Sequence, residues 1–87
     1  MGRRDPREWL ALLEDRQRRK SWRYRDLEAA LVSVGAVRVS KKGSHRTFKH
    51  GDCPRLVTLV DAGNDTLSIG YVTDVVKLLR IALGEAM

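Results

Sequence analysis

The sequence predicts an α+β fold, with a three-stranded antiparallel sheet, two helices on one face of it and an extra helix at the N-terminus. Apolar residues recur at three- and four-residue intervals over residues 24–34 and 72–83, which is typical of amphipathic helices. Between them, apolar and polar residues alternate over residues 37–40, and residues 56–60 form a short run rich in β-branched residues, as in strands. Packing these elements as two layers buries every apolar face at once.

The N-terminal helix is expected over residues 6–18. Asp5 can cap its first turn, Pro6 suits its first position, and an apolar stripe follows at helical spacing: Trp9, Leu12 and Leu13. Its second half, EDRQRRK, is nearly all charged, so the helix is only weakly amphipathic. We therefore predict a helical arm over residues 1–20, which we interpret as mobile, and a single domain over residues 21–87.

A second helix is predicted from a stripe that Ser21 can cap and Gly35 can end; its members are Tyr24, Leu27, Ala30, Leu31 and Val34. After it, Val37 and Val39 alternate with polar residues, which predicts a half-buried strand. The period of the pattern therefore changes from helical to extended within three residues.

The remaining elements follow in the same way. A tight connection at Lys42 and Gly43 lets residues 44–50 pair antiparallel with the first strand, and residues 56–60 form the third strand. The last helix has Asp74 near its start, as the helix dipole favours, and its stripe comprises Val72, Val75, Val76, Leu79 and Leu83.

The charge balance points to a partner. The 87 residues include 17 Lys and Arg against 11 Asp and Glu, a formal net charge of +6. A polyanionic partner is one explanation of this excess, and solubility is the other. Charge alone does not decide between them.

Two observations favour a cytoplasmic protein with no membrane association. The apolar run from Trp9 to Leu13 is too short for a signal sequence or a membrane span. Cys53 is the single cysteine, so no intramolecular disulfide is possible. It lies in the predicted turn GDCPR, and we interpret it as a spectator.

The segment KKGSHRTFKH, residues 41–50, places both histidines among lysines and an arginine. If Phe48 faces the helices, His45 faces the open side of the sheet; the opposite parity would turn Thr47 inward. An imidazole can move a proton at neutral pH, and cations can hold a phosphate beside it: Lys41, Lys42 and Arg46. These groups suit metal-free RNA cleavage, in which the substrate's 2′-hydroxyl attacks the adjacent phosphate. An ordinary basic strand with surface histidines is the alternative.

No metal ion or other cofactor is expected. His45 and His50 are five residues apart, so a strand places them on opposite faces, with no Cys, Asp or Glu in suitable register. Trp9 and Trp22 could stack on bases, but single tryptophans at helical spacing are more often core residues, which we favour here.

The stretch YRDLEAALVSVGAVRVSKKGSHRTFKH, followed by LVTLV and a terminal helix, resembles the HicA family of bacterial toxins. The specific part is G-S-H at the start of the second strand, after a helix ending in VG, and the similarity extends from Trp22 to Leu83. This resemblance implies a double-stranded-RNA-binding-like α-β-β-β-α fold. It also implies a ribosome-independent mRNA interferase of a type II toxin–antitoxin system, held inactive by a HicB antitoxin that covers the site.

By the same resemblance, His45 is the catalytic histidine, acting as general acid or base, and His50 is structural or contacts RNA. The residues expected to contact mRNA surround His45: Lys41, Lys42, Gly43, Ser44, Arg46 and Lys49. A non-enzymatic RNA-binding module with the same fold is the main alternative. A DNA-binding or purely protein-binding domain is the other, although the sequence lacks a convincing helix-turn-helix.

Overall fold

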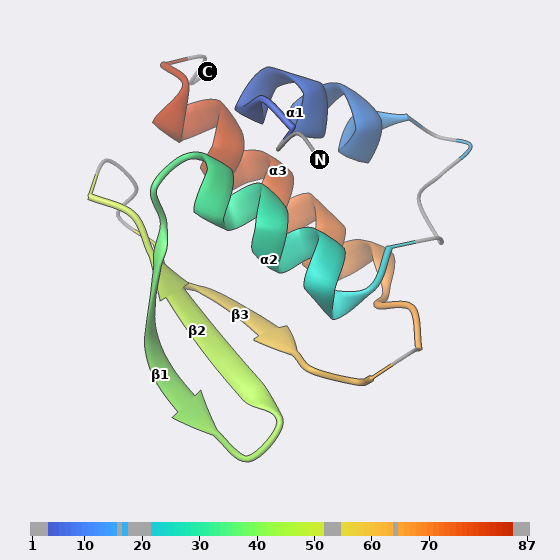
Figure 1. Cartoon of the computed structure of the whole chain (residues 1–87), viewed down its shortest axis with the longest axis vertical. Coiled ribbons are helices and arrows are strands. Elements are labelled where there is room, and N and C mark those ends of the chain that lie inside the picture. The colour runs from blue at the N-terminus through green and yellow to red at the C-terminus, as the bar shows by residue number, and fades with distance from the viewer. Residues whose placement is uncertain (1–3, 16, 18–21, 52–54, 64, 85–87) are drawn as a thin grey trace.

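A helical layer covers one face of a three-stranded antiparallel sheet with strand order β1-β2-β3 (Figure 1). The computed structural model describes residues 4–15, 17, 22–51, 55–63 and 65–84. Within them the elements are α1 (Pro6–Glu14), α2 (Tyr24–Ser33), β1 (Val37–Lys42), β2 (His45–Lys49), β3 (Val57–Val60) and α3 (Ile69–Ala82). The α-β-β-β-α order from α2 onward, preceded by α1, confirms the predicted α+β fold with its extra N-terminal helix.

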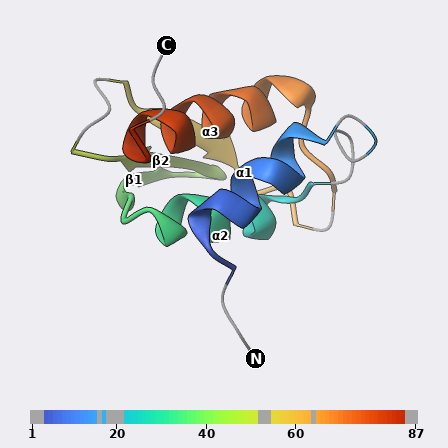
Figure 2. The same cartoon turned by 90° about the horizontal axis from the view of Figure 1, so that it is seen from above.

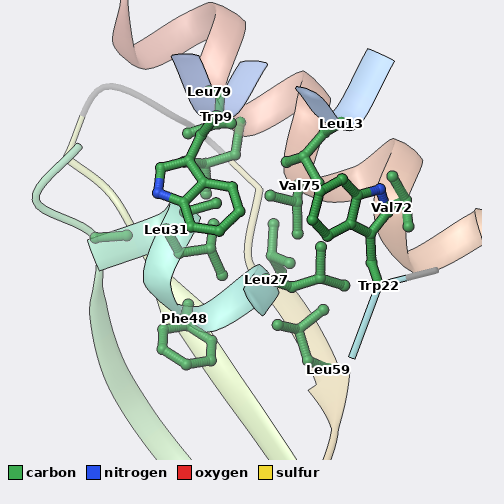
Figure 3. Packing of buried hydrophobic residues seen from close by; sticks show 14 of the residues in the cluster. Trp9, Leu13, Trp22, Leu27, Leu31, Phe48, Leu59, Val72, Val75 and Leu79 are labelled. Atoms are coloured by element: carbon green, nitrogen blue, oxygen red, sulfur yellow. The ribbon is translucent and has the colours of Figure 1, made fainter. Parts of the chain in front are cut away.

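The hydrophobic core lies between the sheet and the helices (Figure 3). Phe48 of β2 and Leu59 of β3 meet Leu27 of α2 and Val75 of α3, and none of these four side chains is more than 1% exposed. Burying a side chain of this size contributes roughly 1.5–3 kcal/mol. The core therefore fixes which face of β2 points inward.

The helix α1 is part of this core, although much of the sequence around it is charged. Trp9, Leu10 and Leu13 are buried, and the Trp9 ring meets the Trp22 ring edge to face at a centroid distance of 6.0 Å. Figure 2 shows α1 in front of α2 and α3, with the sheet behind them. The helical part of the arm is thus packed rather than mobile, and both tryptophans are core residues as predicted. The domain division at residue 20 stays a prediction.

The ends of α1 have separate causes. At its start, Asp5 and Glu8 form a capping box, in which the Asp5 backbone N–H donates to Glu8 Oε1 at 3.3 Å; the Arg7 backbone N–H also donates to Asp5 Oδ1, at 2.8 Å. The helix was expected to reach residue 18 but ends at Glu14, where the apolar stripe that packs on the core also ends. Glu14 forms an ion pair with Arg80 of α3, which joins this end of α1 to the last helix.

The strand β1 contradicts the expectation of a half-buried strand. All six of its residues are exposed, including Val37 at 58% and Val39 at 51%. β1 is an edge strand, and its pairing with β2 shifts in register between Arg38 and Ser40. The extra residue is Val39, so a β-bulge interrupts the alternation on which the prediction depended.

Smaller differences concern boundaries and caps. The turn between β1 and β2 consists of Gly43 and Ser44, one residue later than expected. Asp74 is not in the first turn of α3, because the helix begins at Ile69. The predicted cap Ser21 and the spectator Cys53 lie outside the described residues. Among the helices described here, none is long and apolar enough to span a membrane.

Candidate nucleic-acid interface

The candidate site is built on the β1–β2 hairpin, whose tip is the two-residue turn Gly43–Ser44. Gly43 has φ +59°, and no described residue other than glycine has a positive φ. A positive φ at the first turn position only is the type II′ pattern, which suits a tight hairpin and favours glycine. The turn sets Lys42 directly opposite His45.

The imidazole of His45 lies on the open face of the sheet, which is the first of the two orientations that the sequence left open. Phe48 is buried, so the alternation of side chains turns His45, Thr47 and Lys49 away from the helices. His45 is exposed, and its ring makes no hydrogen bond to a described residue. On the same face, the hydroxyl groups of Thr47 and its cross-strand partner Thr58 in β3 form a hydrogen bond of 3.0 Å.

Two lysines share the face of His45. Lys42 is its cross-strand partner, and directly opposite residues have Cβ atoms about 4.5–5.5 Å apart. Lys49 lies on the same face at the other end of β2, and both lysines are exposed. Their long side chains can therefore reach a phosphate placed over the sheet near the imidazole.

Lys41 and Arg46 lie on the opposite face of the hairpin, where they form a cross-strand pair. The Arg46 guanidinium folds back onto the turn: Nη1 donates to the Gly43 carbonyl at 2.6 Å, and Nη2 lies 3.6 Å from Asp61 Oδ2. The Asp61 backbone N–H in turn donates to the Ser44 carbonyl at 2.7 Å. Arg46 and Asp61 thus brace the turn that carries His45 against the end of β3.

His50 has a structural position. Its Nε2 atom is 2.9 Å from the Val34 carbonyl at the C-terminal end of α2, to which it donates a hydrogen bond. This ring ties the end of β2 to the helix that precedes the hairpin. It is half-buried, unlike His45.

Tyr24, the first residue of α2, is buried and carries a hydroxyl group. The Tyr24 hydroxyl donates to Glu28 Oε2 at 2.9 Å. Burial and the Glu28 carboxylate raise the pKa of Tyr24 to about 12, although the guanidinium groups of Arg38 and Arg46 act in the opposite direction. The phenol is therefore neutral over the whole range in which an imidazole titrates.

Sequence reasoning missed Asp61 and Thr58, because their roles depend on the register between β2 and β3. Nothing in the local pattern LVTLVDAGND indicates which carboxylate meets Arg46. Over the described part of the chain, no group of three or more His, Cys, Asp and Glu side chains could hold a metal ion.

An exposed imidazole at the head of a cationic hairpin, on an α-β-β-β-α core, defines the class: a small α+β protein with a basic, solvent-facing sheet. A family model described as HicA toxin of bacterial toxin-antitoxin matches residues 24–81, from the start of α2 almost to the end of α3. The chain therefore belongs to the HicA toxin family. It is a toxin of a toxin–antitoxin system. Members of the HicA family are generally RNases and pair with HicB antitoxins.

The match leaves α1 outside the family region. No curated protein and no solved structure matches the chain.

Proposed function

We propose that this toxin is a metal-independent endoribonuclease that cleaves mRNA without the ribosome, with His45 as general acid or base. The observation that carries the proposal is the position of the His45 imidazole, exposed on the open sheet face and directly opposite Lys42. Histidine side chains are general acids and bases in many enzymes, and two exposed lysines lie on the same face as this one. It can therefore accept or deliver a proton where a phosphate is held.

The reaction uses the substrate's own nucleophile. The 2′-oxygen of a ribose forms a bond to the adjacent phosphorus, and the bond from phosphorus to the 5′-oxygen of the next nucleotide breaks. One proton leaves the 2′-hydroxyl and one is delivered to the 5′-oxygen, so the products are a 2′,3′-cyclic phosphate and a free 5′-hydroxyl. His45 performs one of these two transfers, which typically contributes about 10²–10⁴-fold to the rate.

The cations hold the substrate. Lys42 and Lys49 neutralise phosphates over the face that bears His45, and the turn and its flank complete the proposed RNA contacts: Lys41, Gly43 and Ser44. Arg46 supports RNA binding through the turn that it braces, because its guanidinium already donates to Gly43 and faces Asp61. Phosphate contacts of this kind make RNA affinity fall as salt rises.

The test compares the two histidines. End-labelled single-stranded RNA is incubated with the purified toxin in EDTA, and the fragments and their 3′ ends are analysed. We expect the His45→Ala variant to lose about 10²–10⁴-fold in cleavage rate while its circular dichroism spectrum stays that of the wild type. The matched control is His50→Gln, which removes the other imidazole but keeps a donor for the Val34 carbonyl; it should cleave at nearly the wild-type rate.

Cleavage by His45→Ala at the wild-type rate would show that the imidazole has no part in the reaction. RNA that binds the wild-type protein but stays intact would favour the alternative, a non-enzymatic RNA-binding module, for which the same exposed lysines suffice. On the proposed function, a HicB-like antitoxin inhibits RNA cleavage by covering the face around His45. An mRNA substrate implies that the toxin acts in the cytoplasm.

A further inference from the structure

The outer backbone edge of β1 is a second exposed feature, next to the face that bears His45. β1 pairs only with β2, so the other edge of this six-residue strand has no neighbouring strand in the described structure (Figure 1). Val37 and Val39 of this strand are more than half exposed, and Val37 lies opposite Lys49, on the same face of the sheet as His45. An edge strand with exposed β-branched residues is a template for another strand.

The charges on β1 restrict what that strand can be. β1 contains three cations and no acidic residue: Arg38, Lys41 and Lys42. If β1 paired antiparallel with β1 of a second copy over all six residues, Arg38 would lie opposite Lys41 at both ends of the pairing. Like charges directly opposite each other destabilise a sheet. The edge therefore disfavours self-association and is complementary to an acidic strand.

We propose that β1 accepts an acidic, extended segment of the antitoxin, which adds a fourth strand to the sheet. Carboxylates opposite Arg38 and Lys41 would form cross-strand ion pairs, and apolar side chains would cover Val37 and Val39. The bulge at Val39 makes the edge irregular, so the added strand must match it, which favours one partner over strands in general.

A strand added at the edge of β1 would also bring the antitoxin close to the open face that bears His45. Neighbouring strands are about 4.7–4.9 Å apart, so an added strand lies roughly 10 Å from β2 and from the backbone of His45. A chain leaving that strand toward the hairpin tip passes Lys42, which faces His45. The proposal depends on the pairing of the family with an antitoxin and not on catalysis by His45, so the two proposals can fail independently.

The first test measures affinity in the absence of RNA. The antitoxin, purified alone, is titrated into toxin variants by isothermal calorimetry at low and high salt. We expect Val39→Glu to weaken binding at least tenfold, because a carboxylate then faces an acidic strand. The matched control is Val32→Glu on α2, since Val32 is exposed to the same extent, 51%, but lies beside Arg4 and Trp9 in a hollow that no residue of β1 lines. It should bind as the wild type does, and wild-type affinity should fall as salt rises.

The second test uses the unmodified complex, so it does not depend on the folding of a variant. Hydrogen exchange of the backbone amides is compared between free and antitoxin-bound toxin. We expect new protection along Val37–Lys42. Absence of protection there, equal affinity of the two glutamate variants, or a toxin that dimerises alone through β1 would each overturn the proposal. Protection of β1 by RNA but not by the antitoxin would do the same.

Discussion

At the scale of single residues, Arg46 illustrates how a cation next to a catalytic candidate can have another task. Its side chain is 12% exposed and lies on the reverse face of the hairpin, where it joins the turn to Asp61. Sequence alone predicts a phosphate contact, because basic residues near a histidine look equivalent. In the structure these basic residues differ: Lys42 shares the face of His45, whereas Arg46 lies on the reverse face and meets Asp61.

We expect Arg46→Met to lower the free energy of unfolding by about 1–2 kcal/mol, because the Gly43 carbonyl and the Asp61 carboxylate lose their donor. Lys49→Met also removes one positive charge, but from the open face, and should change the free energy of unfolding by less than about 0.5 kcal/mol. Urea unfolding of both variants measures the difference. Equal effects would mean that the contact of Arg46 with the turn contributes nothing to stability.

Tyr24 makes a prediction about alkaline pH. Its folded-state pKa is raised to about 12 from an ordinary value of 10.0. The stabilisation from the neutral phenol is therefore complete below pH 10 and is lost as pH rises toward 12. At about 1.4 kcal/mol per unit of pKa difference, the loss is on the order of 2–3 kcal/mol.

The measurement is the free energy of unfolding of the wild type minus that of Tyr24→Phe, followed from pH 9 to pH 12. This difference should fall with pH, because the phenylalanine variant has no hydroxyl to titrate. Tyr71→Phe is the matched control, and it should retain the alkaline loss that Tyr24 causes. A difference that stays constant over this range would contradict the raised pKa.

At the scale of elements, the β1–β2 turn depends on the backbone of Gly43. A Cβ at this position would meet no atom within 4 Å, so an alanine there is disfavoured only by the positive φ of +59°. We expect Gly43→Ala to cost about 1 kcal/mol of stability. Gly51 also has open space but no positive φ, so Gly51→Ala should be nearly neutral. Thermal unfolding of both variants compares them, and similar midpoints would show that the turn tolerates an L-residue.

Elements that face the core could be predicted from the sequence, and the others only in part. The stripes of α2 and α3 have their periods because Leu27, Leu31, Val75 and Leu79 are buried against one another and the sheet. β1 shows the limit: its alternating valines suggest one buried face, yet no layer covers them. An alternating pattern therefore indicates a strand, but it does not show that another layer packs on either face of that strand.

The candidate site divides in the same way. The pleat relates the orientation of His45 to that of Phe48, but the sequence left open whether Phe48 or Thr47 points inward, and the burial of Phe48 decides it. The brace at Asp61 and the bond from His50 to Val34 connect residues 15 or more positions apart. Such contacts depend on tertiary register, which no local pattern contains.

At the scale of the whole molecule, the question is whether α1 and the family region fold as one unit. The family match begins at Tyr24, after α1, whereas the buried cluster includes Trp9, Leu10 and Leu13 together with α2, α3 and the sheet. Leu13 is 1% exposed and contacts the same core as Val72 and Val75 (Figure 3). Residues in one buried cluster are expected to unfold together.

We therefore expect Leu13→Ala to lower the free energy of global unfolding by about 2–5 kcal/mol, the usual cost of truncating a fully buried leucine. The neighbouring Leu12 is only half-buried, so Leu12→Ala is the matched control and should cost clearly less. Urea unfolding followed by tryptophan fluorescence and by circular dichroism should give one coincident transition for each protein. If α1 were instead a detachable arm, Leu13→Ala would leave the main transition unchanged and would release only the α1 amides to exchange. The core contacts of Leu13 argue for the single transition, because an arm that detached would expose Trp22 and the facing surface of α3 together.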